Sequence, residues 1–387
     1  MLLTASRIHD GHNWLPDGTV IEVADDGTIL ALHDATYTGH ATHYDGILVP
    51  GLVNAHCHLE LSHMKGIIPE HTGLIPFLQQ VTFHRNDFTE EQKLTSRHNA
   101  YQQLIANGIV AVGDIANGTD TLDLRSTDKL HIHTFIESIG FTVTHAQQRF
   151  DYSAQLYDTF AAQRATAHIL QQSIVPHAPY SVSKELFSLI DAHKPDAIAS
   201  IHNQECDAEN EFYINKQGAV NDLLNSFGIN SAFFVPSGIS SLQTYLPWFS
   251  SSHSIIFVHN TCSTAADVAF AKQQLQNAFW CLCPNANLYI ENRLPDVPML
   301  LEQNATICIG TDSLSSNHQL SVLTELLTLK SHFPFLRWQT LFTWATYNGA
   351  LALQMDHVIG SIATGKKPGI IHISGLDDGA PSIQRIG

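Results

Sequence analysis

Eight short apolar runs rich in β-branched residues recur along this chain, and segments long enough for a helix separate most of them. They cover residues 47–58, 108–115, 132–139, 173–179, 197–202, 254–260, 278–284 and 305–312. Near-continuous apolar strands that alternate with helices are typical of a parallel sheet covered on both faces. Eight such units close most naturally into a barrel. The pattern therefore predicts an α/β fold of the (β/α)8, or TIM barrel, type.

The segments between these runs and the two chain ends predict different structures. Apolar residues at helical spacing predict helices over 90–107, 155–171, 184–193 and 321–332. The ends instead show short alternating strands with turn signals such as Asp25-Asp26-Gly27, and residues 358–387 repeat this style. We expect one small β domain from both ends (1–50 and 353–387) around a barrel over 51–352.

Composition excludes several classes of function. The 387-residue chain carries a formal net charge of −17, and 44% of its residues are hydrophobic against 14% charged. This balance excludes a disordered chain, and the negative charge gives no support to binding nucleic acid or a membrane surface. No run approaches the roughly 18 apolar residues of a membrane span. The 6 cysteines are scattered without a C-x-x-C pair, so we expect a cytoplasmic protein with reduced thiols.

Polar residues at the ends of the apolar runs are the candidates for chemistry, because barrel enzymes act at the carboxyl ends of their strands. The first run ends with His56 and His58, which the period-2 geometry of a strand places on one face. His202, His259 and Asp312 end the fifth, sixth and eighth runs. Neutral imidazoles and a carboxylate suit a divalent metal such as zinc or iron(II). His56, His58, His202 and Asp312 supply such a set.

These motifs, as a set, resemble the metal-dependent amidohydrolase superfamily, specifically its branch of cyclic-amidine deaminases and chlorohydrolases. The segments that carry the resemblance are 50–58 (PGLVNAHCH), 175–181 (VPHAPYS), 202–205 (HNQE), His259, 283–287 (CPNAN) and 310–313 (GTDS). Both chain ends, including 360–366 (GSIATGK), are similar to the composite β-sandwich of that family. The resemblance implies a distorted (β/α)8 barrel with a small β-sandwich domain built from both ends.

The resemblance also implies the roles of individual residues. His56, His58, His202 and Asp312 would bind one divalent metal ion per chain, zinc in the first place and iron(II) or manganese as alternatives. His259 and Asp312 would hold the nucleophilic water, and Glu205 would move its proton. Binuclear members of the superfamily usually bridge two metals with a carboxylated lysine on the fourth strand. The run at 173–180 has no lysine, which favours a single metal.

The implied reaction is the hydrolytic deamination of an aminopurine-type or other cyclic-amidine compound. The segment from His58 to Ser62, followed by Arg85, resembles aminofutalosine deaminases, which act on an adenine nucleoside derivative. The chain departs from related nucleoside deaminases at 85–86 (Arg-Asn), where they carry a ribose-binding Glu. Four further residues are candidates for contact with a small heterocyclic substrate: His177, Glu60, Asn287 and Glu137.

Several alternatives remain open at the level of sequence. A chlorohydrolase or a guanine deaminase would use the same metal ligands, and an imidazolonepropionase- or hydantoinase-like enzyme would open cyclic amides instead. A scaffold that lost catalysis is a more remote alternative, because every ligand and Glu205 are present. Barrels of this kind often pair, so a homodimer is a further expectation.

Overall fold

The computed structural model describes residues 1–164, 167–376 and 379–386, and their strands form three sheets. Two of these sheets are parallel and four-stranded. One has the order β5-β6-β7-β8, and the other β12-β11-β10-β9. The strands are β5 (Leu52–Cys57), β6 (Ile109–Ala116), β7 (His131–Ser138), β8 (Leu170–Pro176), β9 (Ile198–Asn203), β10 (Ser254–His259), β11 (Asn277–Leu282) and β12 (Thr306–Ile309).

Backbone contacts join the two parallel sheets along both of their edges. At one edge Cys57 forms a parallel bridge with Asp312, and the Thr311 amide donates to the His56 carbonyl oxygen at 3.0 Å. At the other edge the His202 amide donates to the His177 carbonyl oxygen at 3.0 Å. The arrangement is a TIM-barrel-like α/β fold, as the alternation of apolar runs predicts.

Helices separate most of these parallel strands along the chain. Their bounds are α1 (Leu74–His84), α2 (Glu90–Ala106), α3 (Leu122–Arg125), α4 (Ala146–Ala161), α5 (Lys184–His193), α6 (Asp207–Asn215), α7 (Ala219–Ser226), α8 (Ser241–Tyr245), α9 (Ala265–Gln274), α10 (Pro284–Glu291), α11 (Val297–Glu302), α12 (Val322–His332), α13 (Trp338–Thr343) and α14 (Gly349–Ala352), with a 3-10 helix η1 (Leu59–Met64) after β5. Local sequence sets several of these starts. Thr89 begins α2 with a capping box that includes Gln92.

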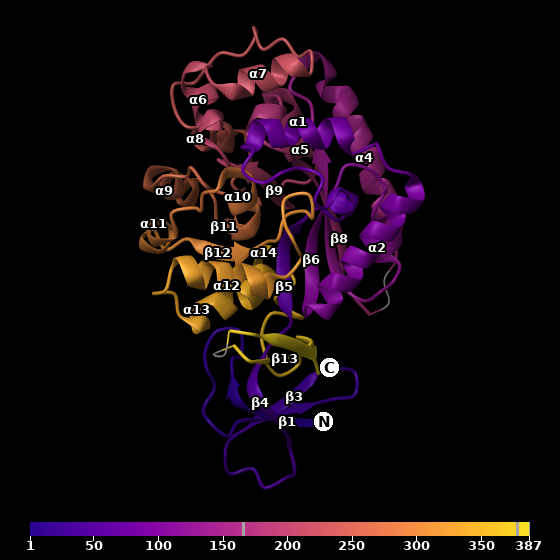
Figure 1. The fold of residues 1–387 in the computed structure, drawn as a ribbon, viewed down its shortest axis with the longest axis vertical. Helices are drawn as coiled ribbons and strands as arrows, with labels where there is room; N and C mark the ends of the chain where they lie inside the picture. The colour runs from indigo at the N-terminus through magenta and orange to yellow at the C-terminus, as the bar shows by residue number, and fades with distance from the viewer. Residues whose placement is uncertain (165–166, 377–378, 387) are drawn as a thin grey trace.

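The third sheet combines both ends of the chain. Its order is β14-β13-β4-β1-β2-β3, with bounds β1 (Leu2–Ile8), β2 (Val20–Val23), β3 (Ile29–His33), β4 (Thr42–Val49), β13 (Ile371–Ser374) and β14 (Ser382–Arg385). Strand β13 pairs antiparallel with β4, so that Ile371 lies opposite Val49. Figure 1 shows this sheet and both termini at one end of the molecule, and α1, α6 and α7 at the opposite end.

Two predicted elements differ from the structure. The run 47–58 is not one strand, because the chain passes from β4 to β5 at Pro50-Gly51. A Cβ on Gly51 would lie 2.1 Å from Val110 Cγ1, so this crossing between sheets requires glycine. The helix predicted over 155–171 is displaced: α4 ends at Ala161, and β8 begins at Leu170. The helices predicted over 90–107, 184–193 and 321–332 are confirmed as α2, α5 and α12.

Apolar side chains cover both faces of the parallel strands. Along β10, Ile255 and Phe257 belong to one buried cluster, whereas Ile256 and Val258 belong to another. This accounts for the continuous apolar runs in the sequence. The 6 cysteines are free and buried. Among the described residues, no helix is both long and apolar enough to cross a membrane.

Candidate active site

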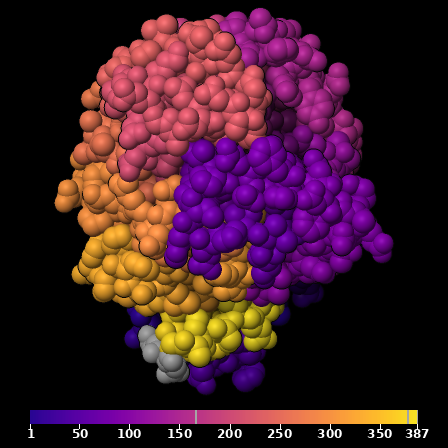
Figure 2. Space-filling model, turned by 45° about the horizontal axis from the view of Figure 1, so that its top comes forward, coloured from indigo at the N-terminus to yellow at the C-terminus, as the bar shows by residue number. Residues whose placement is uncertain are grey.

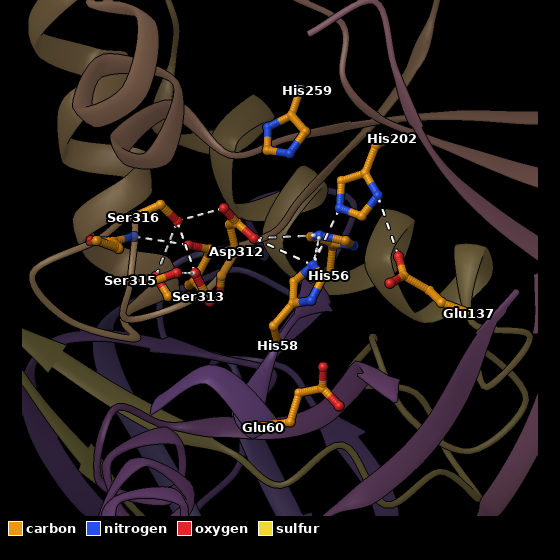
Figure 3. A network of polar contacts seen from close by, with 12 residues as sticks. His56, His58, Glu60, Glu137, His202, His259, Asp312, Ser313, Ser315 and Ser316 are labelled. Carbon is orange, nitrogen blue, oxygen red and sulfur yellow. Dashed lines mark hydrogen bonds and ion pairs between the residues drawn. The ribbon is translucent and has the colours of Figure 1, made fainter. Parts of the chain in front are cut away.

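Three imidazole rings and one carboxylate converge where β5, β9 and β12 end. The Nε2 atom of His58 lies 3.2 Å from Nε2 of His56 and 3.2 Å from Nε2 of His202. Oδ1 of Asp312 lies 3.5 Å from His58 Nε2 and 3.7 Å from His56 Nε2. Figure 3 shows the three rings pointing toward one another, with the Asp312 carboxylate facing His56 and His58. The structure thus brings together the four ligands that the sequence predicts.

The donor set fits a divalent metal. His202 Nδ1 donates to the His177 carbonyl oxygen at 2.8 Å, so the Nε2 atom of His202 carries a lone pair toward the other rings. Three Nε2 atoms this close together cannot all satisfy one another by hydrogen bonds. A cation between them and Asp312 would accept all of these lone pairs. Glu137 Oε1 also lies 3.4 Å from His202 Nδ1, which adds a carboxylate behind this ligand.

Burial and contacts within the cluster together set its charge states. Burial lowers the pKa of His56 and the pKa of His58, so both rings are neutral. Burial opposes ionisation of Asp312, but the hydrogen bond with His56 and the neighbouring imidazoles outweigh it and hold the Asp312 pKa well below its usual value. Neutral imidazoles beside an ionised carboxylate are the protonation states that metal binding needs.

His259 lies beside the cluster in a fixed orientation. Its Nδ1 atom donates to Oδ1 of Asn287 at 2.9 Å, and Asn287 Nδ2 donates to the Thr261 hydroxyl at 2.7 Å. These contacts leave His259 Nε2 as an acceptor that faces Glu205 Oε1 at 3.6 Å. A cavity borders the cluster at His58 and Asp312, and Asn287 does not line it. Asn287 therefore lies behind His259 and sets its tautomer.

Glu205 is a buried carboxyl at the cavity wall, three residues after His202 and just beyond β9. Burial raises its pKa to about 7, while His259 opposes this shift and Asp312 adds to it. A carboxyl with a pKa near neutrality can both accept and release a proton at working pH. The charge state of Glu205 is therefore suited to proton transfer.

The backbone is strained at the strand ends that carry these groups. Four non-glycine residues there have positive φ: Gln204 (46°), His259 (74°), Asn260 (60°) and Asp312 (56°). Such conformations cost free energy and persist only where the surroundings enforce them. Gln204 is held by its side chain, which donates to Asp267 at 3.1 Å and accepts from the Ser263 hydroxyl at 2.6 Å. The strained residues thus lie at or next to Glu205, His259 and Asp312.

A second group of polar side chains lies next to the cluster in the cavity lining. Oε1 of Glu60 pairs with Arg85 at 3.0 Å and accepts from Asn117 Nδ2 at 3.0 Å. Asn117 Nδ2 also donates to Glu137 at 3.0 Å. Burial raises the pKa of Glu60, although Arg85 opposes the shift, and burial raises the pKa of Glu137 to about 8. Glu60 and Glu137 are therefore joined through one amide.

One cavity of about 880 Å³ is lined by most of the polar side chains at this site, namely His58, Glu60, Arg85, Asn117, Glu137, His202, Glu205, His259 and Asp312. It is also lined by His177, whose Nδ1 atom is 2.8 Å from the Ser181 hydroxyl. Sequence reasoning missed Asn117, although it directly follows β6. The rule that applies to His202 and His259, that strand-end polar residues face the site, would have identified Asn117.

The sequence matches the amidohydrolase family over residues 47–385. The chain belongs to this family. The resemblance that the sequence motifs predict is thereby confirmed, and the family is metal-dependent, in agreement with the group of His56, His58 and Asp312, whose side chains could hold a metal ion.

Curated relatives of this amidohydrolase carry the names of nucleoside deaminases. It is 27% identical over 333 residues to an adenosine deaminase of Helicobacter pylori, with 84% of this chain and 78% of the relative covered. It is 26% identical over 294 residues to an aminodeoxyfutalosine deaminase of a Nitratiruptor species, with 75% and 69% covered.

Solved structures share the fold. An aminofutalosine deaminase of Helicobacter pylori in complex with methylthio-coformycin has a TM-score of 0.80 at 23% identity, with 95% of this chain and 91% of that chain covered. A zinc-bound atrazine chlorohydrolase of Arthrobacter aurescens has a TM-score of 0.74 at 16% identity, with 96% and 86% covered. These similarities support the TIM-barrel-like fold with its additional sheet.

Proposed function

We propose that this amidohydrolase hydrolytically deaminates an aminopurine-type nucleoside or a similar cyclic amidine. The position of Glu205 carries the proposal: a buried carboxyl with a pKa of about 7 lines the same cavity as His58 and Asp312 and faces His259. The names of the curated relatives support the same reaction. A fold that had lost catalysis would not need this constellation.

The residues divide the chemistry among them. His56, His58, His202 and Asp312 would hold a divalent cation, which would supply activation of water by lowering its pKa toward about 7. Glu205 accepts a proton from the attacking water and delivers it to a ring nitrogen of the substrate. The water oxygen adds to the ring carbon that carries the amino group. The second proton of the water then passes to that amino group, the C–N bond breaks, ammonia leaves, and the oxygen remains as a carbonyl group beside the protonated ring nitrogen.

Other side chains orient these groups. Asn287 fixes the tautomer of His259, whose Nε2 accepts a hydrogen bond from the attacking water. We propose that His177, Glu60 and Glu137 contact the heterocycle, since each presents a polar side chain to the cavity. The ion pair between Glu60 and Arg85 then limits the mobility of this wall.

The identity of the metal and the closure of the barrel belong to the same proposal. We propose zinc as the metal, since imidazole and carboxylate ligands suit it and related structures hold zinc. We also propose that the eight parallel strands close into a distorted (β/α)8 barrel over residues 51–352, with 1–50 and 353–387 as the additional domain. The backbone contacts along both edges of the parallel sheets support closure.

Ammonia release across a panel of compounds tests the function. The panel contains adenosine derivatives, aminofutalosine, guanine, cytosine and aminotriazines, with chlorotriazines and cyclic amides as alternatives. We expect ammonia from aminopurine nucleosides. Chloride release without ammonia would favour a chlorohydrolase, and ring opening of cyclic amides without ammonia would contradict the proposed reaction.

A further inference from the structure

The cavity extends beyond the polar cluster into a region with apolar walls. Phe77 and Val81 of α1, Phe141 after β7 and Leu224 of α7 line it, and all four belong to a buried cluster separate from those on the two faces of the parallel strands. Helices α1 and α7 lie at the end of the molecule opposite the third sheet, which combines both chain ends (Figure 1). The ring of Phe233 packs on Phe141 with centroids 5.4 Å apart. This part of the cavity therefore offers aromatic and aliphatic surface.

Large apolar side chains remain exposed where this region opens. Ile139, Val143, Phe227 and Phe233 line the cavity and are 42%, 46%, 37% and 48% exposed. In Figure 2 the segments around α1, residues 139–149 and residues 227–233, coloured indigo, magenta and salmon, meet around a recess. A concentration of exposed apolar surface at a concave site marks a place where a ligand is buried.

Polar groups are unevenly distributed along the same cavity. The inner end is lined by His58, His202 and Asp312, by Glu205, and by the ion pair of Glu60 with Arg85. The outer lining carries the exposed Arg149, the imidazole of His145, and a few uncharged polar side chains, which are Thr142, Thr144 and Asn230. Between the two ends the walls are formed mostly by α1, α7 and the aromatic side chains. The volume of about 880 Å³ lies near the top of the roughly 300–1,000 Å³ range of small-molecule pockets, so a bare heterocycle would not fill it.

We propose that the substrate is a heterocyclic amine that carries a bulky apolar substituent, at least as large as a phenyl ring. Helices α1 and α7, with residues 139–143 and 227–233, form the subsite for this substituent. The inference rests on the proposed deaminase function, because one continuous cavity joins this subsite to His58 and Glu205. The heterocycle lies at the polar end, and the substituent covers the exposed aromatic rings.

A series of substituted adenines tests the proposal through kcat/KM for ammonia release. The series compares adenine with N9-alkyl, N9-phenylalkyl and N9-polyhydroxyalkyl adenines. Each buried CH2 group should raise kcat/KM by about 4-fold, and a phenyl ring by on the order of 100-fold. The polyhydroxyalkyl compound should not share this gain. Equal kcat/KM for adenine and phenylalkyl adenine would overturn the apolar subsite but not the deaminase function. Ammonia from no compound, adenine included, would contradict the function itself.

A variant of the cavity wall provides the second test. Phe233→Ser should lower kcat/KM for the phenylalkyl adenine by about 10-fold through a higher KM, with a smaller loss on adenine. Phe335→Ser is the matched control, since Phe335 is 57% exposed and outside the cavity lining. The control should change neither value. An equal loss on both substrates in Phe233→Ser would overturn the assignment of this wall.

Discussion

The proposed proton transfer by Glu205 depends on the chemistry of a single side chain. Glu205→Gln keeps the volume of the side chain but cannot carry the proton. We expect kcat to fall by about 10²–10⁴-fold, the usual contribution of general acid–base catalysis. Metal content should stay unchanged, because Glu205 is not among the proposed ligands.

The exposed Glu211 on α6 supplies the control for this substitution. Glu211→Gln makes the same chemical change on the helix that follows Glu205 and should leave kcat unchanged. Turnover of Glu205→Gln within 2-fold of the Glu211→Gln control would remove Glu205 from the mechanism.

The buried carboxyl group of Glu209 should make the stability of the folded protein depend on pH. Burial raises its pKa to about 8, against the contributions of Ser241 and the Gln204 amide. Between pH 4.5 and 8 the folded protein therefore holds a proton that the unfolded chain releases, so stability falls as pH rises. Glu209→Gln should reduce this slope by up to about 1.4 kcal/mol per pH unit. Urea unfolding at pH 5.5 and 8 measures it, and a slope unchanged from wild type would show that Glu209 does not titrate in this range.

Some functional side chains follow directly from sequence, and others do not. His56 and His58 are predictable because strand alternation places them on one face. The contact of Asn287 with His259 is not, since it joins the start of α10 to the end of β10 across 28 positions of sequence. Sequence alone could mark Asn287 as a strand-end residue but could not show that it lies behind His259.

At the scale of elements, the glycine after β12 allows close packing of the site. A Cβ on Gly310 would lie 2.9 Å from Cys281 Sγ, Cys283 Sγ and His56 Cβ. Gly310→Ala should therefore destabilise the fold by about 1–3 kcal/mol and weaken metal binding, because it separates β12 and Asp312 from His56.

Chemical unfolding and metal titration check this prediction, with Gly118→Ala as the control. A Cβ on Gly118 would meet only a side-chain oxygen of Asp120 at 3.2 Å. The control should keep wild-type stability and metal affinity. If Gly310→Ala behaved like Gly118→Ala, the packing at the end of β12 would not constrain the site.

Two element boundaries cannot be predicted from the periodicity of apolar residues alone. Residues 47–49 and 52–57 form one apolar run, yet they belong to different sheets, since the crossing at Gly51 depends on Val110 from a distant part of the chain. The displaced helix has a similar cause. Apolar residues between 162 and 171 fit a helical pattern, but pairing with β7 draws Leu170 and Gln171 into β8.

In the whole molecule, segments that are far apart in the sequence meet in the additional sheet and in the cavity. That both chain ends join in one sheet was predictable, because both show short strands and turn signals. Sequence could not give the order of the strands in that sheet, because pairing between distant segments leaves no periodic signal. It also could not give the apolar region under α1 and α7, which arises only when three separate segments meet.

Removal of the metal should destabilise the whole molecule. A ligand that binds only the folded chain stabilises it by about 4 kcal/mol at 1,000 times its Kd. We therefore expect a chelator to lower the Tm by several degrees and added zinc to restore it. His202→Asn should show no such zinc-dependent change. A wild-type Tm that is the same with and without chelator would contradict a metal held by this cluster.

Stepwise return of zinc to the chelated protein tests the central claim most directly. The measured quantity is ammonia release from the nucleoside that the panel identifies. A single metal held by His56, His58, His202 and Asp312 predicts no activity without zinc and a linear rise that ends at one zinc ion per chain. Full activity in the chelated protein, or a rise that continues to two zinc ions per chain, would contradict the account.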